Sequence, residues 1–416
     1  MKNKKVLVLD GETRSSLAVV RSLGKEGYSI LVASSMRDGR SLAGSSKYAF
    51  QSIKCPCSLV SPDECRNWVL DFLRSENIYA LIVTKDSSLQ ALASDYDKIK
   101  ELTIFPFVDS QTLFKVQDKS QLLKVAEGFG IPVPRTAELE SNMFVDSDCA
   151  DSEGKFKTGD YSSFPSILKP GQSVQIINKN KTQLNLPRKL VSSWLDVRDF
   201  FKPLSSFYCR YLLQEVISGE GVGIFCLYRE GKCVLDFSHR RILEKPPEGG
   251  VSVLSESIPL PQELMEKVHK LLSHYNWDGV AMVEFKRHYD GKLYLMEINP
   301  RFWGSLQLAI DCGCNFPREL LKVKDSLSET GLPDSGLGKS TYEVGKKLRW
   351  ELGTFDHFLI QLKRGGFRYL KQVFFENALF LFSKNTCFEV FRINDFSPFI
   401  YELRSYFVDL FRAEGK

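Results

Sequence analysis

The chain has 416 residues, which is enough for about two to four domains of ordinary size. Its 56 Lys and Arg against 51 Asp and Glu give a net charge of +5 that is spread along the chain, and this argues against dedicated nucleic-acid binding. No apolar run reaches the roughly 18 residues of a membrane span, and the first run is too short for a signal peptide. We therefore expect a cytoplasmic protein with reduced cysteines, in which neither Cys55/Cys57 nor Cys312/Cys314 has the spacing of a zinc site.

Residues 1–108 alternate short apolar runs with helical stretches. This alternation predicts an α/β domain built on a parallel, doubly wound sheet. The helical stretches are 15–27 and 68–74, and the predicted strands are 5–9, 28–33 and 79–83, with a further segment at 102–107.

The loop after the first strand, DGET at 10–13, lacks the G-x-G-x-x-G turn of a dinucleotide site. Polar residues at strand ends can still face a ligand where the strand order of such a sheet reverses. Asp10, Thr84 and Asp86 are candidates for this role, and ordinary strand-end caps are the alternative.

The middle of the chain mixes a helical stretch with several strand-like segments. The helical pattern of 109–130 ends at GFGIPVPRT, and the polar segment 139–162 predicts a mobile connection. The strand-like segments are 166–170, 211–217, 223–240, 279–287 and 292–299, and the chain after about 322 is helical, basic and aromatic.

The segment 279–302 carries the most informative pattern in the chain. Two alternating runs flank Asp290-Gly291, which predicts a two-residue type I′ turn that pairs Tyr289 with Lys292 and Glu284 with Glu297. With a period of two, one face of this hairpin is apolar and the other is acidic. The apolar face has Ala281, Val283, Phe285, Tyr294, Met296 and Ile298, and the opposite face has Glu284, Glu297 and Asn299.

Two carboxylates directly across a strand pair lie about 5 Å apart and repel each other by about 3 kcal/mol at an effective dielectric constant of 20. A divalent cation would remove this cost, and the oxygen ligands of Glu284, Glu297 and Asn299 suit Mg²⁺. Arg301 follows closely enough to neutralise a developing negative charge. The alternatives are a solvated pair of glutamates, or a three-residue loop that shifts the register and separates them.

This pattern, E…E-x-N-P-R on a hairpin, resembles the ATP-grasp superfamily, and the resemblance spans roughly residues 1–320. It implies an α+β ligase core of two subdomains that binds ATP. It also implies that Glu284, Glu297 and Asn299 hold Mg²⁺, or Mn²⁺ as an alternative, on the ATP phosphates, and that Arg301 is catalytic and faces an acyl-phosphate.

Further positions match the resemblance upstream of the hairpin. Lys119 in QDKSQ and Lys169 in SILKP resemble the two phosphate lysines of the superfamily, although the segment after Lys169, KPGQSVQIINKN, is poor in glycine. The segment LLQEVISGE resembles the hinge that meets adenine and ribose, with a simple turn acid as the alternative for Glu220. The residues that the resemblance assigns to the nucleotide there are Gln214, Glu215, Val216, Ile217 and Glu220.

The sequence His239-Arg240-Arg241 precedes a Gly249-Gly250 turn. A cationic trio beside free backbone amides predicts binding of phosphate or of a substrate carboxylate. This region resembles that of carboxylate-amine ligases, including carbamoyl-phosphate synthase-like members. We assign His239 to the nucleotide and Arg241 to catalysis, and the alternative is a basic loop that only packs at the edge of the lid.

Together these features predict three parts: a Rossmann-like domain at 1–108, an ATP-grasp domain at 109–322 with its lid at about 160–217, and a helical extension at 323–416. The predicted function is an ATP-dependent ligase that joins a carboxylate to an amine through an acyl-phosphate and releases ADP and phosphate. The expected partners are small-molecule substrates and a second copy of the chain, with no nucleic acid and no membrane span.

Two other functions remain open at this point. One is an ATP-binding regulatory protein without catalysis on the same fold. The other is a peripheral membrane or assembly protein that uses the basic aromatic segment 345–375, for which a helical cap on the ligase core is the alternative.

Overall fold

The computed structural model describes most of the chain. The described residues are 4–36, 38–144, 164–172, 175–176, 183–184, 186–204, 208–247, 249–325, 341–381 and 383–414. The connection predicted over 139–162 and the glycine-poor segment after Lys169 therefore lie largely outside the described residues.

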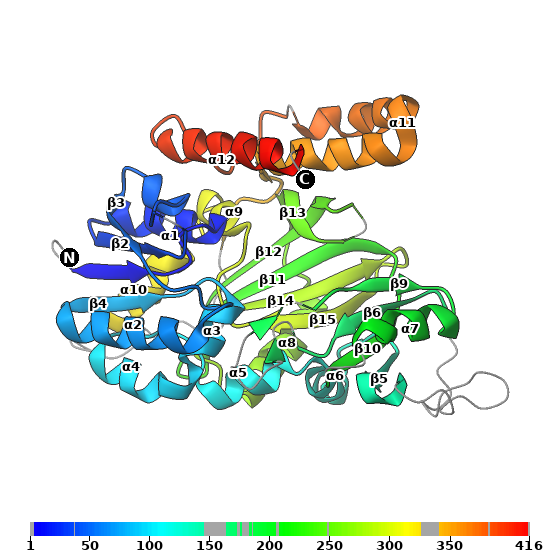
Figure 1. The fold of residues 1–416 in the computed structure, drawn as a ribbon, viewed down its shortest axis with the longest axis horizontal. Helices are drawn as coiled ribbons and strands as arrows, with labels where there is room; N and C mark the ends of the chain where they lie inside the picture. The colour runs from blue at the N-terminus through cyan, green and yellow to red at the C-terminus, as the bar shows by residue number, and fades with distance from the viewer. Residues whose placement is uncertain are drawn as a thin grey trace.

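The N-terminal domain contains a four-stranded parallel sheet in the order β3-β2-β1-β4, which confirms the predicted α/β domain (Figure 1). Its central strands are apolar because both of their faces are buried. The strands are β1 (Lys5–Val8), β2 (Ser29–Ser34), β3 (Ala49–Lys54) and β4 (Ile78–Ile82), and the helices are α1 (Arg14–Lys25), α2 (Pro62–Ser75), α3 (Asp86–Leu92) and α4 (Tyr96–Leu102).

The sequence did not indicate β3, since this edge strand is largely exposed and has no apolar run. Conversely, the segment predicted at 102–107 is not a strand, and only Ile104 forms a bridge, to Ala80.

A second, four-stranded antiparallel sheet lies in the region predicted to be the lid, in the order β5-β10-β6-β9, and is called the lid sheet below. It has an apolar core of its own that includes Phe201 and Tyr211, and it starts at Thr136, earlier than the predicted lid boundary. Its elements are β5 (Thr136–Glu140), β6 (Ser166–Pro170), β9 (Lys189–Val191), α7 (Trp194–Phe201) and β10 (Arg210–Glu215), with the short pair β7 (Gln175–Ile176) and β8 (Gln183–Leu184) nearby in the chain.

The helical stretch predicted at 109–130 is divided at Asp118 into α5 (Ser110–Gln117) and α6 (Lys119–Gly128). The Asp118 carboxylate accepts a hydrogen bond from the backbone N–H of Gln121 and so caps α6.

The central sheet has seven strands in the order β15-β14-β11-β12-β13-β16-β17. The segment predicted as strand-like at 223–240 is a hairpin of two long strands, in which Glu230 and Gly231 both adopt positive φ. The elements are β11 (Gly219–Arg229), β12 (Lys232–Lys245), β13 (Val251–Ser257), α8 (Gln262–His274), β14 (Gly279–His288), β15 (Leu293–Asn299), α9 (Leu306–Asp311) and α10 (Phe316–Asp325).

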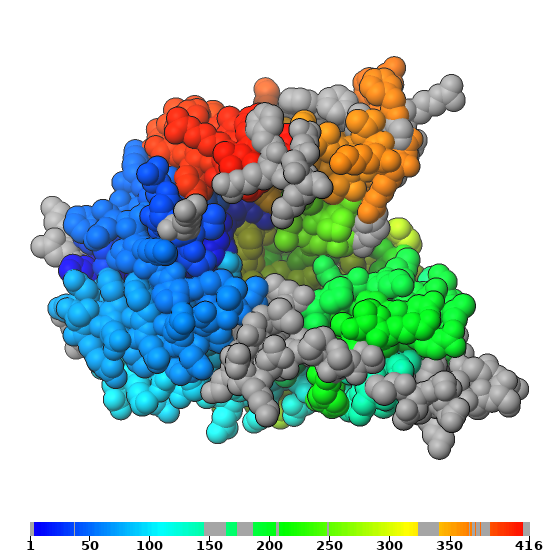
Figure 2. All heavy atoms as spheres, viewed as in Figure 1, coloured from blue at the N-terminus to red at the C-terminus, as the bar shows by residue number. Residues whose placement is uncertain are grey.

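The C-terminal extension is not purely helical, in contrast to the prediction. Its short strands β16 (Lys347–Arg349) and β17 (Thr386–Phe388) extend the central sheet, whereas α11 (Glu351–Leu381) and α12 (Ser397–Glu414) lie across one side of the molecule (Figure 1). Figure 2 shows α12, in red, against the blue N-terminal domain. Arg21 of α1 forms a buried ion pair of 2.8 Å with Asp395, which ties the extension to the N-terminal domain.

Among the described residues, no helix combines the length and the hydropathy that crossing a membrane requires.

Candidate active site

Glu284 and Glu297 lie directly opposite each other on β14 and β15, which confirms the predicted pairing. The turn between the strands differs from the prediction. The backbone N–H of His288 donates to the carbonyl of Lys292 at 2.9 Å, and Gly291 adopts a positive φ of 88°. The loop therefore has three residues, and the predicted pair of Tyr289 with Lys292 is wrong.

A β-bulge restores the register that the longer loop would have lost. Phe285 pairs with Leu295 and Glu284 pairs with Glu297, so Met296 is an extra residue on β15. Because of this shift Leu295 is fully buried, whereas Met296 is only half-buried. Tyr294 is also half-buried, so the predicted placement of Tyr294 and Met296 on the core face is wrong.

Each of the two opposed carboxylates binds a different cation. Glu297 Oε2 lies 2.9 Å from Lys119 Nζ, and Glu297 Oε1 accepts a hydrogen bond of 3.0 Å from Asn299 Nδ2. Glu284 Oε2 lies 2.7 Å from Arg241 Nη2. Burial raises the pKa of Glu297, but Lys119 and Asn299 outweigh this effect and hold its pKa well below the usual range. Glu297 is therefore ionised at neutral pH.

The two predicted phosphate lysines reach this site from two different elements. Lys119 begins α6, and its backbone N–H donates to the carbonyl of Gly171 just beyond β6 at 3.0 Å. Lys169 lies on β6 and is only 8% exposed. Burial first, and then the charge of Lys119, lowers the pKa of Lys169 to about 7, while Glu297 and Glu284 act in the opposite direction.

Arg301 connects the hairpin to the N-terminal domain. Its Nε and Nη2 atoms each lie 2.8 Å from Asp86 Oδ2, at the start of α3. Its Nη2 also donates to Asn299 Oδ1 at 3.4 Å. Asp86 is one of the strand-end candidates from the sequence, but its role as a partner of Arg301 was not predicted, since no local pattern joins residues so far apart in the chain.

His239 is not the cation that the sequence predicts. It is 1% exposed, stacks on Phe225 with ring centroids 4.7 Å apart, and hydrogen-bonds through Nε2 to Ser305 Oγ at 3.0 Å. Burial and the charge of Arg241 lower its pKa to about 3, so it is neutral. Its surroundings are those of a core residue, and its assignment to the nucleotide as part of a cationic trio is therefore wrong.

Side-chain alternation along β12 separates the two arginines. Arg240 binds Glu256 at 2.6 Å and Glu220 at 3.4 Å, whereas Arg241 faces Glu284. Arg241 also lies 3.0 Å from Glu244 Oε1, a contact that the sequence did not predict. Only one of the two arginines thus contacts the acidic pair.

The predicted hinge lies between the last lid strand and the first long strand of the central sheet. Gln214 is buried and donates to Thr136 Oγ1, and Glu215 accepts hydrogen bonds of 2.9 Å from both the backbone and the side chain of Arg135. Val216 is 40% exposed and Ile217 is half-buried in the connection that follows.

Glu220, the predicted ribose ligand, binds Arg287 at 2.9 Å and Arg240 at 3.4 Å. It is therefore engaged with two protein cations on neighbouring strands, β14 and β12.

The N-terminal parallel sheet, the antiparallel lid and the acidic hairpin on the central sheet together define the ATP-grasp fold. Solved structures with similar folds include an L-amino acid ligase from Bacillus licheniformis (TM-score 0.57, 14% identity, 77% of this chain and 74% of that chain). They also include a biotin carboxylase from Campylobacter jejuni (TM-score 0.60, 14% identity, 82% of this chain and 74% of that chain). A third is N5-carboxyaminoimidazole synthetase from Staphylococcus aureus (TM-score 0.56, 15% identity, 83% of this chain and 82% of that chain).

Within this class, residues 209–337 match the family described as "ATP-grasp in the biosynthetic pathway with Ter operon". This match spans less than half of the chain. No curated protein matches the sequence.

Proposed function

We propose that this chain is an ATP-dependent ligase that joins a carboxylate to an amine. The observation that carries the proposal is the opposed pair Glu284 and Glu297, with Asn299 beside it and with Lys119 and Arg241 bound to the two carboxylates. The similar L-amino acid ligase supports this class of reaction. A structurally similar biotin carboxylase domain from Hydrogenobacter thermophilus, in complex with MgADP and bicarbonate, supports the nucleotide and the metal.

The donor set of the hairpin fits Mg²⁺. Glu284 and Glu297 offer carboxylate oxygens and Asn299 offers an amide oxygen, and these hard ligands are the ones that Mg²⁺ prefers. When bound there, the metal would neutralise charge on the nucleotide phosphates. Lys119 and Arg241 now neutralise the carboxylates, so both cations would be free to turn toward phosphate or substrate once the metal takes their place.

Positioning and charge supply the rate in this proposal. Lys119 and Lys169 hold the phosphates while a carboxylate oxygen of the substrate attacks the γ-phosphorus and the bond to the ADP oxygen breaks. An amine nitrogen then attacks the acyl carbon, phosphate leaves, and the amine proton passes to solvent. Arg301, held by Asp86, stabilises the acyl-phosphate, and Arg241 stabilises charge during the attack by the amine.

The hinge residues complete the nucleotide site in this proposal. Gln214, Glu215, Val216 and Ile217 lie where the lid joins the central sheet, so adenine bound at the backbone of this connection would couple the nucleotide to lid closure. Glu220 is not part of this proposal, because it is three residues from Gly223, the partner of Glu284, and side-chain alternation along β11 directs it to the opposite face of the sheet, where it binds Arg287 and Arg240.

The test is product analysis of the full chain with ATP, Mg²⁺ and a mixture of amino acids. We expect ADP and phosphate in equal amounts, together with a new mass equal to an acid plus an amine minus water. Release of AMP would contradict an acyl-phosphate route. Nucleotide binding without turnover of any acid and amine pair would favour the regulatory alternative.

A further inference from the structure

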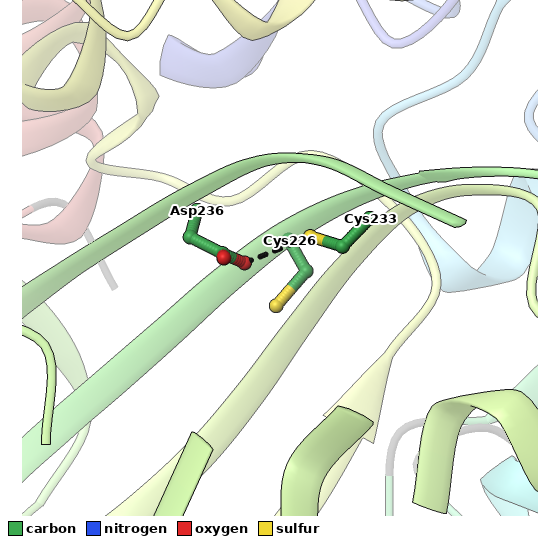
Figure 3. Close-up of side chains that lie close together, drawn as sticks. All are labelled: Cys226, Cys233 and Asp236. Atoms are coloured by element: carbon green, nitrogen blue, oxygen red, sulfur yellow. Dashed lines mark hydrogen bonds between the residues drawn. The ribbon is translucent and has the colours of Figure 1, made fainter. Parts of the chain in front are cut away.

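A cluster of soft metal ligands lies on the central sheet, away from the acidic hairpin. Cys226 comes from β11, and Cys233 and Asp236 come from β12. Their ligand atoms all lie within 4.8 Å of one another, and Cys233 Sγ lies 3.0 Å from Asp236 Oδ1. Figure 3 shows the three side chains close together, with a dashed line between Asp236 and Cys233.

This cluster is separate from the candidate active site. Cys226 is three residues from Gly223 on β11, and Gly223 is the residue that pairs with Glu284. Since side chains alternate along a strand, Cys226 and Glu284 point to opposite faces of the sheet. The cluster therefore cannot share an ion with the opposed carboxylates.

A β-bulge brings the ligands to one face. Cys226 pairs with Asp236 and Leu227 with Leu235, but Tyr228 pairs with Cys233, so one extra residue is inserted on β12. In a regular strand Cys233 and Asp236, three residues apart, would point to opposite faces. The bulge thus places Cys226, Cys233 and Asp236 on one face of the sheet, and the spacing C-x₆-C…D in the sequence would not indicate this.

Helix α8 places a candidate for the fourth donor, His269, beside Asp236. His269 Nε2 lies 3.7 Å from Asp236 Oδ2, and His269 Nδ1 hydrogen-bonds to the hydroxyl of Tyr228. A hydrogen bond from one ring nitrogen is the usual way in which a protein orients the other nitrogen of a metal-binding histidine. An open pocket of about 860 Å³, lined in part by Asp236 and His269, gives access from solvent.

We propose that Cys226, Cys233, Asp236 and His269 bind a thiophilic divalent metal ion, for which Zn²⁺ is the best match. Thiolate, imidazole and carboxylate are the three ligand types that Zn²⁺ accepts, and four protein ligands match its usual coordination number. Ligands at zinc distances of about 2.0–2.3 Å lie about 3.3–3.8 Å from one another in a tetrahedron. Cys226, Cys233 and Asp236 are already within 4.8 Å of one another, whereas His269 is within such reach of Asp236 and its ring would have to move toward the two cysteines. Bound metal would join the β11–β12 hairpin to α8.

Metal binding at this site must displace protons. The hydrogen bond with Cys233 and burial raise the pKa of the Cys226 thiol. The hydrogen bond with Cys226 lowers the pKa of the Cys233 thiol, but burial and the charge of Asp236 outweigh it, so this pKa is raised as well. In the metal-free protein both sulfurs hold their protons, and each thiol that binds the ion releases one proton to solvent.

The proposal is tested with Co²⁺, which reports thiolate ligation by a charge-transfer absorption band. Titration of the reduced full chain with Co²⁺ alone is expected to produce this band at one ion per chain, and Zn²⁺ is expected to abolish it by displacement. Cys226→Ser and Cys233→Ser should each weaken binding by more than about 100-fold, and Tyr228→Phe by about 10–100-fold through the loss of the His269 orientation.

Cys57→Ser is the matched control, because Cys57 is a half-buried thiol outside the cluster, and it should leave the titration unchanged. Elemental analysis of the protein purified without chelator covers the case in which a cysteine variant does not fold, and we expect zinc in wild-type protein. The absence of both zinc and the cobalt band in wild-type protein would overturn the proposal. So would a Cys226–Cys233 disulfide in the native protein, detected by mass spectrometry without reduction.

Discussion

Glu284 and Glu297 face each other across β14 and β15 because two irregularities of the hairpin compensate each other. The loop at the tip is one residue longer than a type I′ turn, and Met296 is one residue too many on β15. Without the bulge, Met296 would face Glu284 and Glu297 would point to the apolar side. The backbone N–H of Leu295, on the outer side of this edge strand, donates to the carbonyl of Pro132 at 2.9 Å.

Neutralising either carboxylate is expected to abolish turnover. Glu284→Gln and Glu297→Gln retain the side-chain volume but remove the charge that the proposed metal and the flanking cations require. We expect each variant to lose more than about 100-fold in kcat with ATP and Mg²⁺. Phosphate release measures the loss, and circular dichroism checks the fold. Wild-type turnover in either variant would contradict the metal assignment, and Glu263→Gln, on the exposed side of α8, is the matched control.

Lys169 is expected to make ATP affinity depend on pH. Its pKa of about 7 means that it is charged below pH 7 and neutral above it in the free protein. Bound phosphate would favour the charged form, so above pH 7 binding takes up a proton and affinity falls as pH rises, by up to about tenfold per pH unit.

The variant Lys169→Arg isolates this effect, because a guanidinium stays charged throughout the same range. Calorimetric titration with ATP between about pH 6 and about pH 8 should show a decline in wild-type affinity that the variant lacks. The titration of ATP itself affects both proteins equally. Identical pH profiles for the two proteins would exclude a phosphate role for this lysine.

Asp86 is expected to position Arg301. The substitution Asp86→Asn removes the charge that holds the guanidinium through two contacts of 2.8 Å. A misplaced catalytic group lowers the reaction rate by up to about 100-fold. We therefore expect kcat to fall by about 10–100-fold while the KM for ATP changes little. Steady-state kinetics with both substrates separates the two parameters. The control is Asp97→Asn, at an exposed position of α4. An increase confined to the KM for ATP in Asp86→Asn would refute the positioning role.

The buried pair of Arg21 with Asp395 is expected to stabilise the whole chain. The Asp395 carboxylate also accepts hydrogen bonds from Ser46 Oγ at 2.7 Å and from the backbone of Lys47 at 2.9 Å. Asp395→Ala leaves a buried guanidinium without its counter-ion, and we expect the free energy of unfolding to fall by about 3–5 kcal/mol. Urea denaturation measures this change. Exposed Asp409→Ala should change stability by less than about 0.5 kcal/mol, and equal effects of the two substitutions would show that the pair is not a structural link.

The same contacts bear on the possibility that the C-terminal extension acts at a membrane surface. Deletion of the extension would remove β16 and β17 from the central sheet together with the partner of Arg21. A truncated chain would therefore lose stability as well as any interfacial helix. Vesicle binding is better compared between the full chain and a variant with a substitution at exposed Phe367 of α11.

The sequence by itself determined the features that depend on local pattern. Apolar runs predicted three of the four N-terminal strands, because a buried strand needs apolar side chains. The alternation of 279–302 predicted two paired strands with acidic residues on one face, but the Glu284–Glu297 pair agrees with the prediction only because the bulge at Met296 offsets the extra loop residue. β3 escaped prediction because an exposed edge strand needs no apolar run.

Only the tertiary structure decided the features that depend on irregular backbone or on contacts between distant segments. A bulge leaves no mark in composition, so the extra residues on β12 and β15, and with them the grouping of Cys226, Cys233 and Asp236, appear only when the strands pair. Charge states follow the same logic, since His239 is neutral because the folded chain buries it and removes water from its ring. The sequence shows which residues can carry a charge. The partner that each of them binds depends on how distant segments of the chain pack together.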